Sequence, residues 1–558
     1  MKKCIILFCL NISLVLSVDM NFSLETKYGD GNKITRQGSI IPDTSKYKFI
    51  ENILDINTTF DNGLYIFMQV EYSDPPVFGS TLKGFNSAYL EYFGDNYAVK
   101  AGNLYSLYGR GLSLNMSQSQ TIDFDNSVRG VEFKYMWNNL IFYGLAGASH
   151  FKYRSNPAFE QPDLLLDNTV LFTGSEYYSD IWGTIQYSLL HEDAIISSAD
   201  IETYSTGISD LSLELSDRIS THNLEIPQKD TLTSIDHNIC WGSSFRGVDF
   251  YVEKVWNSYT KILGEQETGS KLYMSLYTDL FGFGITYEYK NYNQKYYLPT
   301  VSNAPIVFRE GNSTLASQNN HSINWGDEIG HQLEVNKALS KNFNMVWNLS
   351  MAYRHSIDTF TELSLSEILI VDSKTDIYAQ YPFRQTYLEL SGWLMSEKIY
   401  IKLAIDQFDE LEGHKLESNS AFTVPTLLTF DMGRGNSITT YYEKQYREWT
   451  KWTAGIADKD QDRNYNSNYF SFTFNNVKRF SISFFYEDEN YDKRVFGETW
   501  AEGTNVWKGI DLTGHINNTS QLSLFYGSQK GGLVCANGVC AEQPGFDDGI
   551  KVTFRTIL

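Results

Sequence analysis

The stretch Leu54-Asp-Ile-Asn-Thr-Thr-Phe-Asp-Asn-Gly-Leu-Tyr-Ile-Phe-Met-Gln-Val-Glu-Tyr72 decides the fold class. Hydrophobic or β-branched residues occupy every second position on both sides of Asp61-Asn62-Gly63. Because successive side chains of a β-strand point to opposite faces, this period gives each half one apolar and one polar face. Asn-Gly between two such runs indicates a tight hairpin turn. The stretch therefore predicts two antiparallel strands, each with an apolar face.

The same unit recurs along the whole chain, beginning at Asp19–Tyr28, where Met20 and Phe22 alternate with Asn21 and Ser23. Tight turns are expected at Asp61-Asn62-Gly63, Gly94-Asp95-Asn96, Trp137-Asn138-Asn139, His191 to Asp193, Gly247, Asp279-Leu280, Leu339 to Asn342, Ser396-Glu397, Asp431 to Gly435, Asn475 to Val477 and Asn517 to Thr519. Long polar connections are expected at residues 29–46, 103–128, 152–179, 205–235, 290–329, 356–383, 447–466, 488–506 and 528–547. Short and long connections therefore alternate along the chain.

This alternation of connections is typical of a transmembrane β-barrel, whose periplasmic turns are short and whose extracellular loops are long. About 11 short turns imply roughly 24 antiparallel strands, within a range of about 22 to 26. We therefore expect residues 18–558 to form one all-β domain, a transmembrane antiparallel β-barrel with both termini on the periplasmic side. A soluble propeller or β-helix is the alternative. The sequence has no fixed repeat of about 20 to 50 residues, which argues against both.

The last strand is suited to closing such a barrel. In hydrocarbon no water satisfies the backbone, so the first and last strands of the wall must pair. Val552, Phe554 and Thr556 share one face of the C-terminal segment. Most outer-membrane proteins end in an aromatic residue that the assembly machinery reads, and here Leu558 stands in that place. We expect outer-membrane lipid around the barrel and the barrel assembly machinery as a partner during biogenesis.

The N-terminus predicts a signal peptide over residues 1–17. Lys2 and Lys3 precede the apolar run Ile5–Leu16, and cleavage is expected after Ser17. A retained membrane anchor and a lipoprotein modified at Cys9 are the alternatives. The shortness of the apolar run disfavours the first, and the bulky residue before Cys9 disfavours the second. Strands begin directly after this segment, so we expect any occlusion of the barrel to come from loops, of which 290–329 is the longest.

The composition excludes two classes of protein. The mean hydropathy of -0.32 and the lack of a further apolar run of about 20 residues exclude a polytopic helical membrane protein. A net charge of -22 leaves no basic face to neutralise phosphates, so no nucleic-acid partner is expected. Aromatic residues reach 15% and the chain has only 11 Pro, which favours strands.

Two cysteines near the C-terminus, Cys535 and Cys540, are separated by Ala-Asn-Gly-Val. A turn containing Asn-Gly can bring the two thiols together, and an exported protein meets an oxidising environment. We therefore predict a disulfide between them. A zinc site is the alternative, but two thiolates without a nearby His or a second cysteine pair make an incomplete ligand set.

The most distinctive stretch is Gly102-Asn-Leu-Tyr-Ser-Leu-Tyr-Gly-Arg-Gly-Leu112, which is followed by Asp123-Phe-Asp-Asn-Ser-Val-Arg-Gly130. Here, and in Gly531-Gly-Leu-Val-Cys-Ala-Asn-Gly-Val-Cys540 running to Gly549-Ile-Lys-Val-Thr-Phe554, the chain resembles a family of uncharacterised outer-membrane β-barrels of Bacteroidota-type bacteria. The resemblance implies a porin-like membrane barrel in the outer membrane and brings no established substrate. Its motif positions are Gly102, Asn103, Tyr105, Gly109, Gly111, Asp125, Asn126 and Gly130.

Gly109 and Gly111 allow positive φ angles and a tight fold that projects Arg110 between them. Our hypothesis is that residues 103–128 turn inward and narrow the pore. The constriction would then consist of Arg110, Asp123, Asp125 and Arg129. The alternative is a surface loop whose glycines and ion pairs hold only its own shape.

Asp458, Asp460 and Asp462 are spaced like the oxygen ligands of a calcium loop. Arg463 replaces the glycine of such loops and Tyr469 replaces the final Glu, so a solvated acidic segment is the alternative. The nine His are scattered, and no nucleophile elbow, zinc-protease or Walker motif occurs in the sequence. We therefore expect neither an enzyme nor a cofactor.

These observations favour a porin-like channel for small polar solutes or a single class of substrate. Its lumen would be lined by the polar residues of the alternating strands, such as Glu25, Lys27, Asp55, Glu71, Lys100, Glu132, Lys134 and Lys402. The alternatives are a non-conducting surface adhesion or structural barrel, and an exporter or receptor that works with unidentified partner chains. The solute, the ion selectivity and the oligomeric state are left open by the sequence.

Overall fold

The computed structural model describes residues 18–35, 43–77, 81–120, 124–153, 164–205, 210–294, 304–311, 313–319, 321, 323, 326–355, 383–412, 417–453, 456–495, 499–536 and 539–558. The predicted signal peptide, residues 1–17, and the candidate constriction residue Asp123 lie outside the described residues. The first strand begins at Val18.

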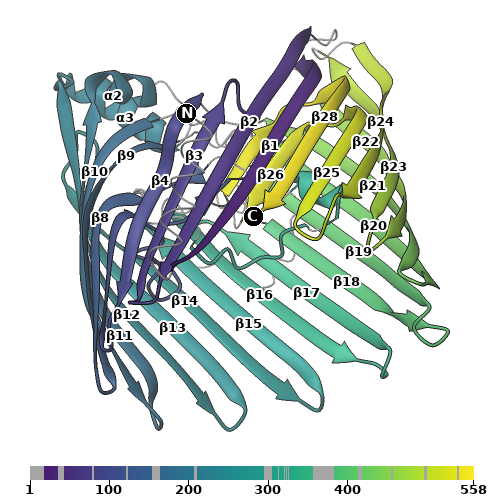
Figure 1. Cartoon of the computed structure of the whole chain (residues 1–558). Helices are drawn as coiled ribbons and strands as arrows, with labels where there is room; N and C mark the ends of the chain where they lie inside the picture. The colour runs from purple at the N-terminus through teal and green to yellow at the C-terminus, as the bar shows by residue number, and fades with distance from the viewer. Residues whose placement is uncertain are drawn as a thin grey trace.

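Twenty-four antiparallel strands form one closed wall, which confirms the predicted barrel. The circle closes because β1 pairs with β2 on one side and with β28 on the other, so that the first and last wall strands lie side by side in Figure 1. The wall strands are β1 Val18–Thr35, β2 Asp43–Phe60, β3 Leu64–Ser73, β4 Leu82–Phe93, β5 Tyr97–Leu104, β8 Val128–Trp137, β9 Leu140–Tyr153, β10 Leu164–Ser179, β11 Gly183–Ser197, β12 Lys229–Phe245, β13 Val248–Thr260, β14 Gln266–Leu280, β15 Phe283–Asn293, β16 Asp327–Ala338, β17 Phe343–Tyr353, β18 Phe383–Leu394, β19 Ile399–Glu412, β20 Glu417–Gly433, β21 Asn436–Thr453, β22 Ile456–Asn476, β23 Phe480–Val495, β24 Thr499–His515, β25 Ser520–Gln529 and β28 Phe546–Ile557.

All the short turns lie on one rim of the wall. They comprise residues 61–63, 94–96, 138–139, 180–182, 246–247, 281–282, 339–342, 395–398, 434–435, 477–479 and 516–519. The turn predicted at His191 to Asp193 is wrong, because these residues lie inside β11 and the turn is Asp180 to Trp182. That turn contains Ile181 and Trp182, residue types that favour strands. Gly183, with φ of +74°, follows it.

The opposite rim carries the other connections, and several of the long ones that were predicted are wrong in extent. β1 and β2 leave only residues 36–42 between them, β21 and β22 only 454–455, and β23 and β24 only 496–498. A membrane crossing takes about 9–11 residues of a tilted strand, whereas β22 has 21. The remainder of such a strand lies beyond the hydrocarbon, so its outer face is polar and resembles a loop in the sequence.

The two faces of the wall differ in polarity. On β20, Phe422, Leu428 and Phe430 stay 40–43% exposed on the outer face, whereas Thr423 on the other face is 2% exposed. Apolar side chains facing outward are those that lipid would cover. An empty lumen would leave the inward polar side chains accessible. Their burial shows that other parts of the chain fill the lumen.

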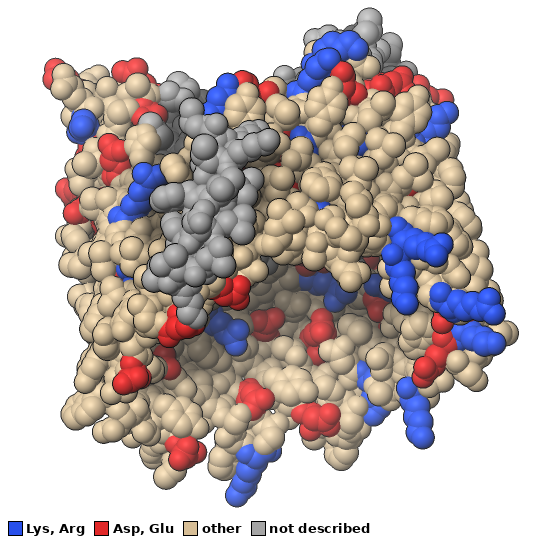
Figure 2. All heavy atoms as spheres, in the orientation of Figure 1, with Lys and Arg blue, Asp and Glu red and all other residues tan. Residues whose placement is uncertain are grey.

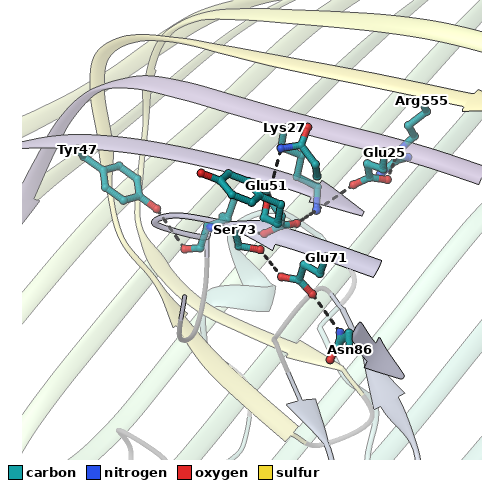
Figure 3. A network of polar contacts seen from close by, with 11 residues as sticks. Glu25, Lys27, Tyr47, Glu51, Glu71, Ser73, Asn86 and Arg555 are labelled. Carbon is teal, nitrogen blue, oxygen red and sulfur yellow. Dashed lines mark hydrogen bonds and ion pairs between the residues drawn. The ribbon is translucent and has the colours of Figure 1, made fainter. Parts of the chain in front are cut away.

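Charged residues of both signs meet on the lumen face where the wall closes. Lys27 on β1 lies 2.7 Å from Glu51 on β2 and 2.9 Å from Glu25. Glu25 in turn pairs with Arg555 on β28, and Figure 3 shows these side chains pointing toward one another across the three strands. The predicted lumen positions Glu25 and Lys27 are therefore confirmed on the inner face.

Two helices lie between β11 and β12, at the rim that carries the long connections (Figure 1). They are α2 Ser198–Ser205 and α3 Asp210–His222. Ile201 and Leu215 of these helices are buried against lumen-facing residues of β10 to β13, including Ile196. In the described part of the chain, no helix combines the length and apolar character needed to cross a membrane.

Candidate functional site

Two connections turn into the barrel and occupy its lumen. The first inward segment comprises residues 105–120 and 124–127, between β5 and β8, and contains the short strands β6 Gln118–Ser119 and β7 Phe124–Asp125. The second inward segment comprises residues 304–311, 313–319, 321 and 323, between β15 and β16, and contains the helical turn η2 Ala316–Asn319. Both contact side chains on the lumen face of wall strands that are distant in sequence. They therefore lie inside the barrel.

A buried carboxylate on the wall holds the first inward segment. Glu253 of β13 accepts hydrogen bonds from the backbone N–H of Arg110 (2.6 Å) and of Leu112 (3.3 Å). It also accepts the Tyr251 hydroxyl at 2.7 Å and the Asn238 amide at 3.0 Å, and it is 0% exposed. We call this set of contacts the first clamp. Hydrogen bonds to a charged group are about twice as strong as neutral ones, so the clamp fixes the segment firmly.

The backbone reaches Glu253 because residue 109 is glycine. Gly109 has φ of +61°, a conformation that other residues rarely adopt. A Cβ there would lie 2.7 Å from the Oε2 atom of Glu253 and 2.8 Å from the Sγ atom of Cys240. The first clamp therefore depends on this glycine for both its backbone conformation and its space.

A second buried carboxylate holds the second inward segment. Glu443 of β21 accepts the backbone N–H of Leu315 (3.0 Å) and of Ala316 (3.2 Å), and also the Ser313 hydroxyl. The Tyr441 hydroxyl donates to its other oxygen at 2.9 Å. Glu443 is 0% exposed as well. We call this set the second clamp.

Both clamps have the same construction. In each, a Tyr stands two positions before the Glu, as in Tyr251 and Glu253 or Tyr441 and Glu443. Residues two apart share one face of a strand, so the hydroxyl can reach the carboxylate. Each carboxylate uses both oxygens and receives two backbone N–H groups that have no partner in a ladder. The two inward segments are thus docked by the same arrangement of side chains.

A buried histidine adds a charged contact to the second inward segment. His321 lies between Glu410 of β19 and Glu328 of β16, with its Nε2 atom 3.3 Å from Glu328. Lys290 of β15 pairs with the other oxygen of Glu328. Burial alone would lower the pKa of His321, but the two carboxylates outweigh it and raise the pKa to about 9. The ring is therefore charged at neutral pH and binds both carboxylates.

The two inward segments meet in one apolar cluster. Leu112 of the first and Ala304 and Val307 of the second pack together with wall residues that include Tyr273 and Tyr292. Further clusters join Leu114 to β9 and β10 and Phe308 to β17 through β19. The segments therefore form one continuous body, which we call the plug, across the lumen.

A hairpin from the C-terminal part of the chain adds to the plug. It consists of β26 Gly532–Ala536 and β27 Val539–Gln543, and β26 packs against η2. A cavity of about 580 Å³ lies between η2, this hairpin and the lumen face of β22 to β28. Figure 2 shows a hollow in the molecule in which acidic and basic side chains gather. The filling of the lumen thus leaves space along one sector of the wall.

The structure places the candidate constriction residues at different sites. Arg110 lies in the lumen, with its guanidinium 5.2 Å from the centre of the Tyr251 ring. Asp125 accepts the Tyr105 hydroxyl at 3.0 Å and the Ser127 N–H at 2.8 Å within the inward segment. Arg129 shares a face of β8 with Val131 and Phe133, which are exposed on the outside of the wall. Arg110 and Arg129 are therefore not brought together.

The remaining motif residues shape the first inward segment and its junction with the wall. Asn126 accepts the Ser117 N–H and donates to the Asn115 carbonyl, whereas Asn103 accepts the N–H of Ala88. Gly102, Gly111 and Gly130 stand where a Cβ would lie 2.3, 2.8 and 2.0 Å from a neighbouring atom. Their contacts hold the segment in shape.

Two other predicted sites lie where side chains are not described. Cys535 and Cys540 are directly opposite each other in the β26–β27 register, and the disulfide stays a prediction. Asp458, Asp460 and Asp462 belong to β22, so their backbone is an extended strand. Within the ranges given above, no group of three His, Cys, Asp or Glu side chains forms a metal site.

Sequence reasoning missed the clamp residues Glu253 and Glu443. Each sits in a strand whose local pattern is ordinary, and its partner in the first clamp lies 143 residues away. The only local signal is the Tyr two positions earlier, which occurs elsewhere too, as in Tyr387 and Glu389.

A closed antiparallel wall with an apolar outer face and a polar, plugged lumen defines the class of the transmembrane β-barrels. Within this class the chain belongs to the family described as "Family of unknown function (DUF6029)", which it matches over residues 1–557. No curated protein matches the sequence.

Several solved structures are similar at low identity. The siderophore receptor PirA from Pseudomonas aeruginosa is 8% identical, with a TM-score of 0.43 over 97% of this chain and 80% of that chain. The P pilus usher PapC translocation pore is 10% identical, with a TM-score of 0.41 over 96% and 99%. A BenF-like porin from Pseudomonas fluorescens Pf-5 is 10% identical, with a TM-score of 0.36 over 70% and 93%.

Proposed function

We propose that the protein is a transport barrel of the bacterial outer membrane that admits small polar solutes when its plug moves. The observation that carries this proposal is the pair of clamps, because each concentrates the polar contacts between an inward segment and the wall on one buried carboxylate, beside the apolar clusters. A plug that served only as filling would not need polar docking sites. Buried apolar residues would pack the lumen at less cost in desolvation.

The clamps also explain how the lumen can open without unfolding the wall. The ladder hydrogen bonds of the 24 strands are independent of Glu253 and Glu443 side chains. Breaking a clamp removes about four hydrogen bonds, each worth roughly 1.5–3 kcal/mol when a charged group takes part. A bound solute or a partner chain would have to replace this energy together with that of the apolar contacts. The wall is the fixed part and the plug is the moving part.

The test is single-channel conductance of the full chain in a planar lipid bilayer. We expect the unmodified barrel to open rarely and the double variant Glu253→Gln, Glu443→Gln to open more often and wider. A glutamine has one acceptor oxygen, whereas each clamp uses two. Glu448→Gln is the matched control, because Glu448 lies on β21 as well but is exposed on its outer face.

Heat-modifiable migration on a gel shows whether each variant forms a closed barrel. If the double variant fails to fold, Tyr251→Phe with Tyr441→Phe removes one hydrogen bond from each clamp and tests the same idea more gently. A folded clamp variant that conducts no better than the parent would exclude the moving plug. It would favour a structural or adhesion barrel instead.

A further inference from the structure

A row of aromatic side chains lines the cavity beside the plug. Tyr469 of β22 and Phe485 of β23 have ring centres 6.3 Å apart, and Phe485 and Phe525 of β25 have theirs 5.9 Å apart. In both pairs the ring planes differ by 15°. All three side chains line the cavity of about 580 Å³. Near-parallel rings at this spacing form a continuous apolar strip on an otherwise polar wall.

A glycine in the strand between them makes this strip possible. Gly509 of β24 pairs with Phe485 on one side and with Gly527 of β25 on the other. A Cβ at Gly509 would lie 2.6 Å from a ring carbon of Phe485 and 2.7 Å from one of Phe525. The two rings therefore approach each other across a strand that presents no side chain at this point.

The row continues at both ends of the strip. The ring centre of Tyr441 of β21 lies 5.8 Å from that of Tyr469, and the ring centre of Phe546 of β28 lies 6.2 Å from that of Phe525. Tyr47 of β2 follows at 6.2 Å from Phe546. Aromatic rings thus run across the seam of the barrel from β2 to β21.

Hydroxyl groups and paired charges surround the strip. Among the lining residues, Thr473 and Ser483 share a hydrogen bond of 2.8 Å. Lys530 pairs with two carboxylates, at 2.6 Å from Glu489 and 3.6 Å from Glu487. The lining carries two basic residues, Lys530 and Lys551, and two acidic residues, Glu487 and Asp511. The cavity therefore offers aromatic rings, hydrogen-bonding groups and little net charge side by side.

From this arrangement we propose that the cavity binds a short oligosaccharide, which names the substrate class of the transport barrel and rests on that proposed function. A sugar ring has an apolar face of C–H groups and a rim of hydroxyls. The C–H face packs on the negative face of an aromatic ring, and the hydroxyls bond to Ser, Thr and carboxylate groups at the edge. The cavity volume lies within the range of about 300–1,000 Å³ for small-ligand sites.

The test is calorimetric titration of the full chain in detergent with maltotriose, cellotriose, chitotriose and, as the competing class, trialanine. We expect at least one of the sugars to bind and the peptide not to bind. Phe485→Ala and Phe525→Ala each weaken sugar binding roughly three- to tenfold, the loss of one aromatic contact. Phe484→Ala leaves it unchanged, because Phe484 is the next residue of β23 and is 48% exposed on the outer face.

Phe485→Leu, which keeps an apolar side chain without a ring, replaces the alanine variant if that one fails the gel test for folding. Binding of none of the sugars, binding of the peptide instead, or equal affinity in the ring variants would overturn the oligosaccharide proposal. These results do not bear on the conductance of the clamp variants, so the moving plug is tested independently of the sugar site. If a sugar binds but does not change the single-channel conductance, the binding site stands and transport of that sugar through the barrel is refuted.

Discussion

Gly109 shows how one missing side chain can decide the position of a whole segment. We expect Gly109→Ala to undock the first inward segment, because the new Cβ would meet Glu253 and Cys240 and because φ of +61° is unfavourable for alanine. The cost is about 1–3 kcal/mol for the backbone alone, and the clash adds to it. Hydrogen exchange of residues 105–120 measures the effect.

Gly433→Ala is the control for placing an alanine at a positive φ angle elsewhere in the barrel. Gly433 has φ of +76°, and a Cβ there would have no atom within 4 Å. Faster exchange of residues 105–120 in the Gly109 variant and unchanged exchange in the control would locate the effect at Gly109. Equal protection in both variants and the parent would contradict the role of Gly109.

His321 predicts how the second inward segment responds to pH. Its pKa is raised from 6.5 to about 9, so the charged ring stabilises docking fully below pH 6.5, and this contribution is lost as the pH rises through 9. The contribution is on the order of 3 kcal/mol. We therefore expect hydrogen exchange of residues 304–319 to accelerate between pH 7 and pH 10, beyond the intrinsic rise.

The variant His321→Gln provides the comparison, since its docking cannot depend on the charge of the ring. Its exchange should be fast at both pH values once the intrinsic rate is subtracted. If the parent and the variant show the same pH dependence, His321 does not hold the segment through its charge.

At the scale of elements, β22 extends beyond the part of the wall that lipid covers. Asn464 and Phe470 share its outer face and are both exposed, but six positions separate them, about 20 Å along a strand. A membrane-impermeant maleimide should label Asn464→Cys on intact cells and should not label Phe470→Cys. Labelling of both positions, or of neither, would contradict the placement of this strand. The parent, in which Cys240 is buried, gives the background.

The β26–β27 hairpin predicts a disulfide that a mass measurement can detect. Cys535 and Cys540 are opposite each other in its register, and directly opposite residues have Cβ atoms about 4.5–5.5 Å apart. A non-reduced tryptic digest should give a peptide 531–551 that is lighter by two hydrogens than after reduction. Closing so short a loop contributes about 2 kcal/mol. A free-thiol mass in protein from an oxidising compartment would contradict the bond.

The wall could be predicted from the sequence because its signals are local. The alternation in Leu54–Tyr72 and the turn at Asp61-Asn62-Gly63 lie within a few residues of each other, and the structure has them as β2, a turn and β3. The length of the strands could not be predicted, because an outer face that leaves the lipid is polar and loses its alternation. Residues 447–466 therefore resembled a loop.

At the scale of the whole molecule, the site was less predictable than the wall. The sequence indicated that residues 103–128 could turn inward, through the glycines on both sides of Arg110. It could not indicate what they would meet, since Glu253 is 143 residues away from Arg110. No local pattern predicts the cavity either, because Tyr469, Phe485 and Phe525 come together only through the pairing of β22 to β25.

The two clamps also place a condition on the order of biogenesis. Each joins an inward segment to a strand that comes later in the chain, Arg110 to Glu253 and Leu315 to Glu443, at separations of 143 and 128 residues. Neither clamp can form while the earlier strands are being assembled, although the second segment can already pack on β14 and β15, and contacts between such distant residues form slowly. Docking of the two segments is therefore completed only after β13 and β21 have joined the sheet. Closing the wall and locking its interior are then linked steps of one assembly process.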